Sequence, residues 1–173
     1  MARKLSYFLI NKPCKILSQF TEENGNPGLG SIYRLPNGVY PVGRLELDSE
    51  GLLILTDDKR LNDRLLNPKN AHRREYWVEV EGKPTREAID QLSNGISINI
   101  GGKSHDTLPA VVKELKDVSL PERVPPVNRV KHPETSWLSI TLTEGKSRQV
   151  RKMTAKVGLP TLRLIRVAIE NLE

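Results

Sequence analysis

The sequence predicts an α+β protein built on a mainly antiparallel sheet. Segments in which apolar and polar residues alternate outnumber segments in which apolar residues recur at helical spacing. The two kinds of segment also do not follow the strict strand–helix order that a doubly wound parallel sheet requires. The chain of 173 residues contains no internal repeat, and its length suits one domain or two small lobes that share a core.

The first elements are two strands separated by a long loop. Residues 5–10 form a short apolar segment that ends at an Asn-Lys-Pro sequence, and residues 21–38 are rich in Gly, Pro and Asn. A loop of that length inside a compact domain is usually functional or mobile. Residues 51–56, GLLILT, form a continuous apolar run, which indicates a strand covered on both faces.

A short helix is predicted directly after this strand. Asp57 or Asp58 can serve as its N-cap, and Pro68 ends it. The alternation over residues 74–82 then predicts a strand with Tyr76 on the same face as two valines. A second helix follows over residues 83–95, with Thr85 as its cap and Gly95 as its end.

Further strands are predicted from the C-terminal half of the chain. Residues 96–100 alternate, residues 107–115 can continue the sheet, and residues 118–136 carry four prolines and form a connection or an arm. Another strand is predicted around residues 138–142. A third helix over residues 144–158 has Ser147 as its predicted cap and Gly158 as its end, and a last strand spans 161–172.

Composition restricts the class of protein. Hydrophobic residues make up 37% and charged residues 28%, and the net charge of +6 points weakly to a polyanionic partner. Cys14 is the single cysteine, so no internal disulfide can form and a cytoplasmic location is expected. The three histidines lie far apart without cysteine pairs, which argues against zinc. The apolar segment over 5–10 is too short for a signal peptide or a membrane span.

Two groups of charged residues are candidates for chemistry. Glu46 lies among several carboxylates just before the buried strand, and it belongs either to a solvated turn or to a catalytic loop that also contains Arg44. The other group is basic and lies on the third predicted helix, opposite an apolar stripe of Val150, Met153 and Val157. It is either a solvated face or a surface that contacts phosphates. Its members are Arg148, Arg151, Lys152 and Lys156, beside Lys146.

Three segments taken in order resemble a known family. GRLELDSEGLLILT, REYWVEVEG and EGKSRQVRKMTAKVGLPTLRLIRVAI are similar to the motifs of ribosomal RNA pseudouridine synthases. The match is to the ribosomal small-subunit synthase A family and, within it, most closely to the large-subunit synthase E group. The resemblance covers nearly the whole chain and implies the pseudouridine synthase catalytic fold. That fold is a mixed, mainly antiparallel sheet flanked by helices and loops, with a central RNA-binding cleft.

The resemblance also implies a reaction and residues for it. Such enzymes flip a uridine out of RNA, cleave its glycosidic bond and rejoin the uracil through carbon, without a metal or organic cofactor. Tyr76 matches the family tyrosine that lies against the base, and Arg151 matches the basic residue that pairs with the catalytic carboxylate. Arg44 matches the motif arginine, and Leu164 the apolar residue that lines the pocket. We further expect a single catalytic domain over residues 1–173 that acts as a monomer, without an N-terminal RNA-binding appendage.

Glu46 departs from the family pattern, which has aspartate at this position. The extra methylene displaces the carboxylate by roughly 1 to 1.5 Å, and a misplacement near 1 Å can cost on the order of a hundredfold in rate. We therefore expect weak activity or none from this form, and the alternative is an RNA-binding protein that keeps the scaffold without the reaction. A glycoside hydrolase with Glu46 and Glu50 as its carboxylate pair fits poorly, because only 5% of the residues are aromatic. A structural ribosomal protein would usually be more basic.

Overall fold

The computed structural model describes residues 4–173, which divide into two compact units. The first unit extends to Ala71, and the second comprises His72–Glu173. A separate cluster of buried apolar side chains lies in each unit. Among the described residues, no helix is long and apolar enough to cross a membrane.

The first unit is a small antiparallel sheet with a long covering loop. Strand β3 (Glu50–Thr56) pairs with β1 (Tyr7–Lys12) along nearly its whole length and with the short β2 (Tyr40–Pro41) near its end. The predicted strand over 51–56 is therefore confirmed, and most of its side chains are buried. Strand β1 begins two residues later than predicted, because the Ser6 N–H donates to Asp57 Oδ1 (2.8 Å) before the ladder starts.

The predicted loop over 21–38 and the helix that follows β3 are also confirmed. The loop contains one 3₁₀ turn at Leu29–Ser31, whose leucine is fully buried in the core of this unit. Helix α1 (Lys59–Leu66) has Asp58 as its N-cap, and the carboxylate accepts from the N–H groups of Arg60 and Leu61. Asp57 is therefore not the cap.

The second unit contains a four-stranded antiparallel sheet and a separate hairpin. The sheet has the order β9-β4-β8-β7, and each neighbouring pair is antiparallel. Its strands are β4 (Arg74–Glu81), β7 (Val111–Leu115), β8 (Thr135–Leu142) and β9 (Thr161–Ile169). Strands β5 (Ser97–Ile100) and β6 (Lys103–Asp106) form the hairpin. The prediction missed β6 because its sequence, KSHD, has no apolar alternation.

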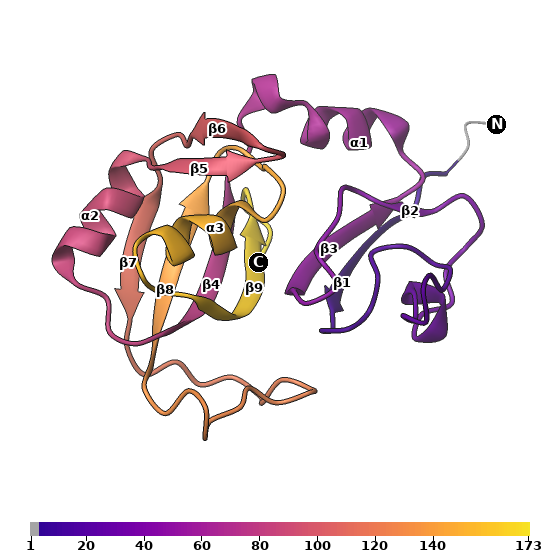
Figure 1. The fold of residues 1–173 in the computed structure, drawn as a ribbon. Coiled ribbons are helices and arrows are strands. Elements are labelled where there is room, and N and C mark those ends of the chain that lie inside the picture. Colours follow the sequence, from indigo (N-terminus) through magenta and orange to yellow (C-terminus); the bar gives the residue numbers. More distant parts are fainter. Residues whose placement is uncertain (1–3) are drawn as a thin grey trace. The chain divides into compact units, whose positions relative to one another are not determined.

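Two helices and the hairpin cover one face of this sheet (Figure 1). Helix α2 (Arg86–Asn94) begins after Thr85, whose hydroxyl accepts from Ala88 N–H, and ends at Gly95, as predicted. Helix α3 (Gln149–Lys156) lies across the sheet. Apolar side chains from both helices, from β5 and from the strands form one buried core, in which Leu92, Leu138 and Met153 are fully buried.

The start of α3 differs from the prediction. Ser147 does not cap the helix, which begins at Gln149, one residue later than a cap at Ser147 predicts. Arg148 occupies the N-cap position in the left-handed conformation (φ 53°, ψ 32°), without a side-chain capping bond. The side chain of Gln149 stabilises this turn, because its Oε1 accepts a hydrogen bond from Lys146 N–H at 2.9 Å.

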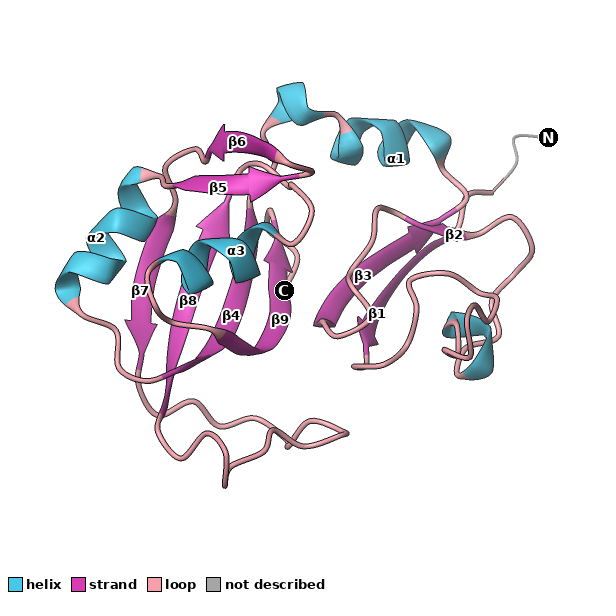
Figure 2. Cartoon of the chain, viewed as in Figure 1, coloured by secondary structure: helices cyan, strands magenta, loops and turns pink. Residues whose placement is uncertain are grey.

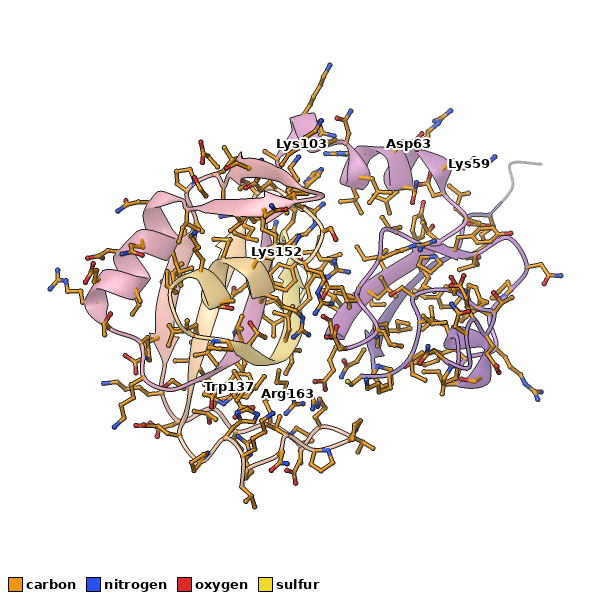
Figure 3. All side chains as sticks on the ribbon, in the orientation of Figure 1. Lys59, Asp63, Lys103, Trp137, Lys152 and Arg163 are labelled. Carbon is orange, nitrogen blue, oxygen red and sulfur yellow. The ribbon has the colours of Figure 1, made fainter. Side chains whose placement is uncertain are left out.

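A proline-rich arm over residues 116–134 connects β7 to β8 without regular structure (Figure 2). The predicted connection over 118–136 is confirmed except at residues 135 and 136, which belong to β8. Arg129 binds both oxygens of Glu79, a β4 carboxylate that is only 1% exposed. Arg123 Nη1 donates to the carbonyl of Leu162 at 3.0 Å, and Arg163 Nη1 donates to that of Pro121 at 2.9 Å. The arm is therefore tied to β9 and to β4. Figure 3 labels Arg163 next to this arm.

Candidate functional site

The loop that joins β2 to β3 carries Arg44 and Glu46. Leu45 between them is buried, and Ser18 fixes its backbone: the Ser18 hydroxyl donates to Leu45 O (2.7 Å) and accepts from Leu45 N–H (3.0 Å). The N–H of Lys15 donates to Leu47 O at 2.7 Å. The backbone is therefore held on both sides of Glu46, while Arg44 is exposed.

The Glu46 carboxylate is part of a tight turn. Ser49 N–H donates to the Glu46 carbonyl at 3.0 Å, and Ser49 Oγ donates to Glu46 Oε2 at 3.4 Å. Ser49 is only 2% exposed and Glu46 is half-buried. A half-buried carboxylate on a backbone fixed in this way has a defined direction, as a reacting group requires.

A buried lysine lies beside this loop, and no sequence pattern predicts it. Lys12 is fully buried at the end of β1, and its Nζ donates to the carbonyls of Pro13 (2.8 Å) and Ile16 (2.7 Å). Burial lowers the pKa of Lys12 to about 8, against the effect of Cys14 and of the carboxylates Glu50 and Asp48. Glu50 and Asp48 are half-buried and balance this internal cation, whereas a solvated turn would leave both exposed.

Tyr76 lies on β4, directly opposite Arg166 of β9. Arg166 is only 5% exposed and makes a side-chain hydrogen bond with Tyr76. Burial lowers the pKa of the Arg166 guanidinium, and the interaction with Tyr76 opposes that shift. The ring of Tyr76 packs against the core of the second unit, so both the ring and its hydroxyl are held. Sequence reasoning missed Arg166, because alternation alone does not identify a buried arginine.

The other predicted residues of the second unit lie on β9 and α3. Leu164 is 5% exposed and lies opposite Val78 in the same core that holds Val150 and Met153. Because these two helix residues face the core, the cations of α3 lie on its other side. Arg151 and Lys152 are half-buried, and Arg148 and Lys156 are exposed. Figure 3 labels Lys152 on this helix.

The predicted site residues thus fall into two preformed groups. Arg44 and Glu46 belong to the fixed loop of the first unit. In the second unit, Tyr76 and Leu164 pack in the core, and the α3 cations lie on a helix whose apolar side faces that core. The functional groups of the predicted site are the carboxylate of Glu46, the aromatic ring of Tyr76 beside the Arg166 guanidinium, and the cationic side chains of α3. Within residues 4–173, no three His, Cys, Asp or Glu side chains are grouped as a metal site.

Solved structures of similar fold include proteins named pseudouridylate synthases. A crystal structure of a pseudouridylate synthase superimposes with a TM-score of 0.78 at 24% identity, covering 96% of this chain and 63% of that one. Human RNA pseudouridylate synthase domain containing 1 gives 0.63 at 14% identity, with 94% and 74% covered. These likenesses confirm the predicted α+β pseudouridine synthase fold.

Curated relatives lead to the same family. A protein from Xanthomonas axonopodis pv. citri named ribosomal large subunit pseudouridine synthase E is 47% identical over 163 residues, which cover 93% of this chain and 84% of the relative. One of the same name from Vibrio vulnificus is 44% identical, with 96% and 68% covered. Residues 6–156 match the family model described as RNA pseudouridylate synthase. The chain therefore belongs to the RNA pseudouridylate synthase family.

Proposed function

We propose that this chain isomerises uridine to pseudouridine in large-subunit ribosomal RNA. The observation that carries this proposal is the 47% identity, over 93% of the chain, to a protein named ribosomal large subunit pseudouridine synthase E. In the reaction the bond from the ribose to uracil nitrogen breaks and a bond from the ribose to uracil carbon forms. Substrate and product contain the same atoms, so the reaction needs no net oxidant or reductant.

Three residues are proposed to act on the flipped uridine. Glu46 supplies the carboxylate at the family's catalytic position, and Arg151 supplies the basic residue of the family motif. Tyr76 offers its ring to the base, and its side chain interacts with the buried guanidinium of Arg166. This assignment is supported by the fixed backbone around Glu46 and by the restrained ring of Tyr76.

The cations of α3 are proposed to contact RNA phosphates. Arg148 and Lys156 are exposed, Lys152 is half-buried, and all three project from a helix whose other side is fixed in the core. Arginine forks and lysine ammonium groups are the usual partners of phosphate oxygens. We propose that the protein acts as a monomer in the cytoplasm, where its ribosomal RNA substrate is found.

A pseudouridine map of ribosomal RNA tests the proposed function. RNA from cells with the gene, without it, and without it but complemented is mapped by mass spectrometry after chemical labelling of pseudouridine. We expect one large-subunit site, or a small set, to lose the modification and to regain it on complementation. An unchanged map would contradict the proposed reaction in cells.

Glu46 favours a second candidate, an RNA-binding protein that does not catalyse the isomerisation. A carboxylate one methylene longer keeps its charge, so RNA affinity would survive even if turnover did not. The two candidates separate in one assay, the release of tritium from RNA that carries 5-tritiated uridine. Binding without release on naked RNA and on assembled particles would favour the second candidate.

A further inference from the structure

Glu144, in the loop between β8 and α3, is bound by three donors. Its Oε1 accepts from Leu108 N–H and from Gln149 Nε2, both at 2.8 Å, and its Oε2 lies 3.0 Å from His105 Nε2. Burial opposes ionisation of this carboxyl, but the bonds from Leu108, Gln149 and His105 outweigh it and hold the pKa of Glu144 below its ordinary value. The side chain is therefore a charged, half-buried acceptor.

Gln149 extends this network into the loop. Its side chain is only 3% exposed; its Nε2 donates to Glu144 and its Oε1 accepts from Lys146 N–H at 2.9 Å. Both ends of one buried amide are thus used to close the turn. Arg148, inside this turn, takes a left-handed backbone conformation (φ 53°), which is unfavourable for residues other than glycine. The turn is held in a conformation that its sequence does not favour.

The third partner connects the turn to the hairpin. His105 lies on β6, and Ile98 of β5 is buried in the core beside α3. The hairpin is therefore fixed by apolar packing and presents the imidazole to Glu144 from a rigid support. Figure 3 labels Lys103 on this hairpin.

The apolar core cannot provide the same restraint for the turn itself. Residues 145–148 are all exposed, whereas the first core residue of α3 is Val150. The core fixes the helix axis, but the direction of the turn depends on polar contacts. Lys146 and Arg148 lie within this turn, so the backbone that carries their side chains is held by the bonds of Glu144 and Gln149.

We propose that His105, Glu144 and Gln149 are positioning residues that direct Lys146 and Arg148 toward RNA phosphates. This inference rests on the RNA-modifying function proposed above. The hydrogen bonds of these residues stabilise the unfavourable backbone conformation of the turn before RNA binds. Less conformational entropy is therefore lost when RNA binds.

Two variants and two controls test this proposal. Gln149→Leu keeps the side-chain volume and removes both amide bonds, and His105→Phe removes the imidazole contact. His105→Gln keeps a donor and should restore the restraint. Gln91→Leu removes an exposed glutamine that bonds Glu87 on α2 and is the matched control. Each protein is first checked for folding by urea unfolding.

The first measurement is tryptic cleavage after Lys146 and Arg148, followed by mass spectrometry. We expect Gln149→Leu to raise the cleavage rate by roughly tenfold or more, the scale expected when two hydrogen bonds are removed. His105→Phe should raise it less, and His105→Gln and Gln91→Leu should leave it near the wild-type rate. An unchanged rate in Gln149→Leu overturns the proposed restraint, and no RNA enters this measurement.

The second measurement is the affinity for a large-subunit rRNA fragment as a function of salt. We expect the slope of log affinity against log salt to fall by about 0.7 for each phosphate that Gln149→Leu no longer binds. His105→Gln should keep the wild-type slope, which a general loss of stability would not explain. If the turn loosens and the slope stays the same, this inference is wrong while RNA binding stands. A wild-type chain that binds no rRNA overturns the proposed function, and the inference with it.

Discussion

Replacing Glu46 by Asp isolates one methylene in the proposed site. The substitution withdraws the carboxylate by roughly 1 to 1.5 Å, the length of one carbon–carbon bond along the side chain. The backbone has little freedom to compensate, because Ser18 holds Leu45 by two hydrogen bonds and Lys15 holds Leu47 by one. The backbone therefore does not compensate for the shorter side chain, and nearly the whole displacement changes the distance between the carboxylate and the substrate.

The expected effect is a gain in turnover without a gain in binding. A misplacement near 1 Å costs on the order of a hundredfold, which corresponds to about 2.7 kcal/mol of barrier. Glu46→Asp should therefore raise the single-turnover rate at least about a hundredfold. The charge is unchanged, so RNA affinity should change less than about twofold.

The assay is tritium release from a large-subunit rRNA fragment labelled at uridine C5, with affinity measured on the same fragment. Glu50→Asp is the matched control, since it makes the same change in a half-buried carboxylate at the start of β3 and should leave turnover as it was. If the Glu46 form already turns over as fast as Glu46→Asp, position 46 does not hold the reacting carboxylate. If neither form reacts on fragments or on assembled particles, the RNA-binding candidate is favoured.

Three further predictions concern charge, pH and packing. Alanine at Arg148, Lys152 and Lys156 together should lower the slope of log affinity for rRNA against log salt by about 0.7 for each phosphate no longer bound. Alanine at the exposed Lys83, Lys113 and Lys116 is the control and should leave the slope unchanged. Equal slopes in the two triple variants would refute a phosphate surface on α3. The pKa of Lys12 is about 8 in the folded chain against an ordinary 10.5, so the unfolded chain binds more protons between these values. Urea unfolding should therefore show stability relative to Lys12→Met rising from pH 7 to pH 10, and a flat difference would contradict the burial of that charge. Met153→Ala should cost about 2 to 5 kcal/mol of unfolding free energy by the same method, because Met153 is fully buried, while Lys156→Ala should stay within about 0.5 kcal/mol.

The sequence correctly predicted those elements whose ends depend only on residues that are close together in the chain. Thr85 and Gly95 bound α2 as predicted, because a cap needs only a hydroxyl and a glycine at the correct spacing. The predicted start of α3 was wrong because the turn before this helix depends on contacts with residues that are distant in the sequence. Ser147 has the right side chain for a cap, but the amide of Gln149, bonded to Glu144 and to Lys146 N–H, supports a different turn. That competition involves β8 and the hairpin, which a local pattern does not contain.

The site residues divide in the same way. The predicted faces of β4 and α3 are confirmed, because alternation and helical spacing are local patterns: Tyr76 packs against the core, and Val150 and Met153 are buried in it. The roles of Tyr76 and of the α3 cations stay predictions. Arg166 was missed because its role depends on the register of β4 against β9, which shifts between Glu75 and Tyr76. A shift of one residue changes which side chain lies opposite the tyrosine. Lys12 was missed because lysine is rarely buried, and only the two carbonyls that accept from its Nζ explain its place.

Buried cations count in the formal net charge but are not available to bind RNA. Lys12, Arg163 and Arg166 are each less than 10% exposed, and they bind backbone carbonyls or a phenol inside the protein. Such charges are fixed to internal partners and release no counterions when RNA binds. The formal +6 is therefore a poor measure of the charge that RNA meets. For the proposed RNA interface, the relevant quantity is the number of cations on one side of α3 and in the turn before it. Since each phosphate bound in single-stranded RNA contributes about 0.7 to the salt slope, roughly three to five such phosphates predict a slope of about 2 to 3.5.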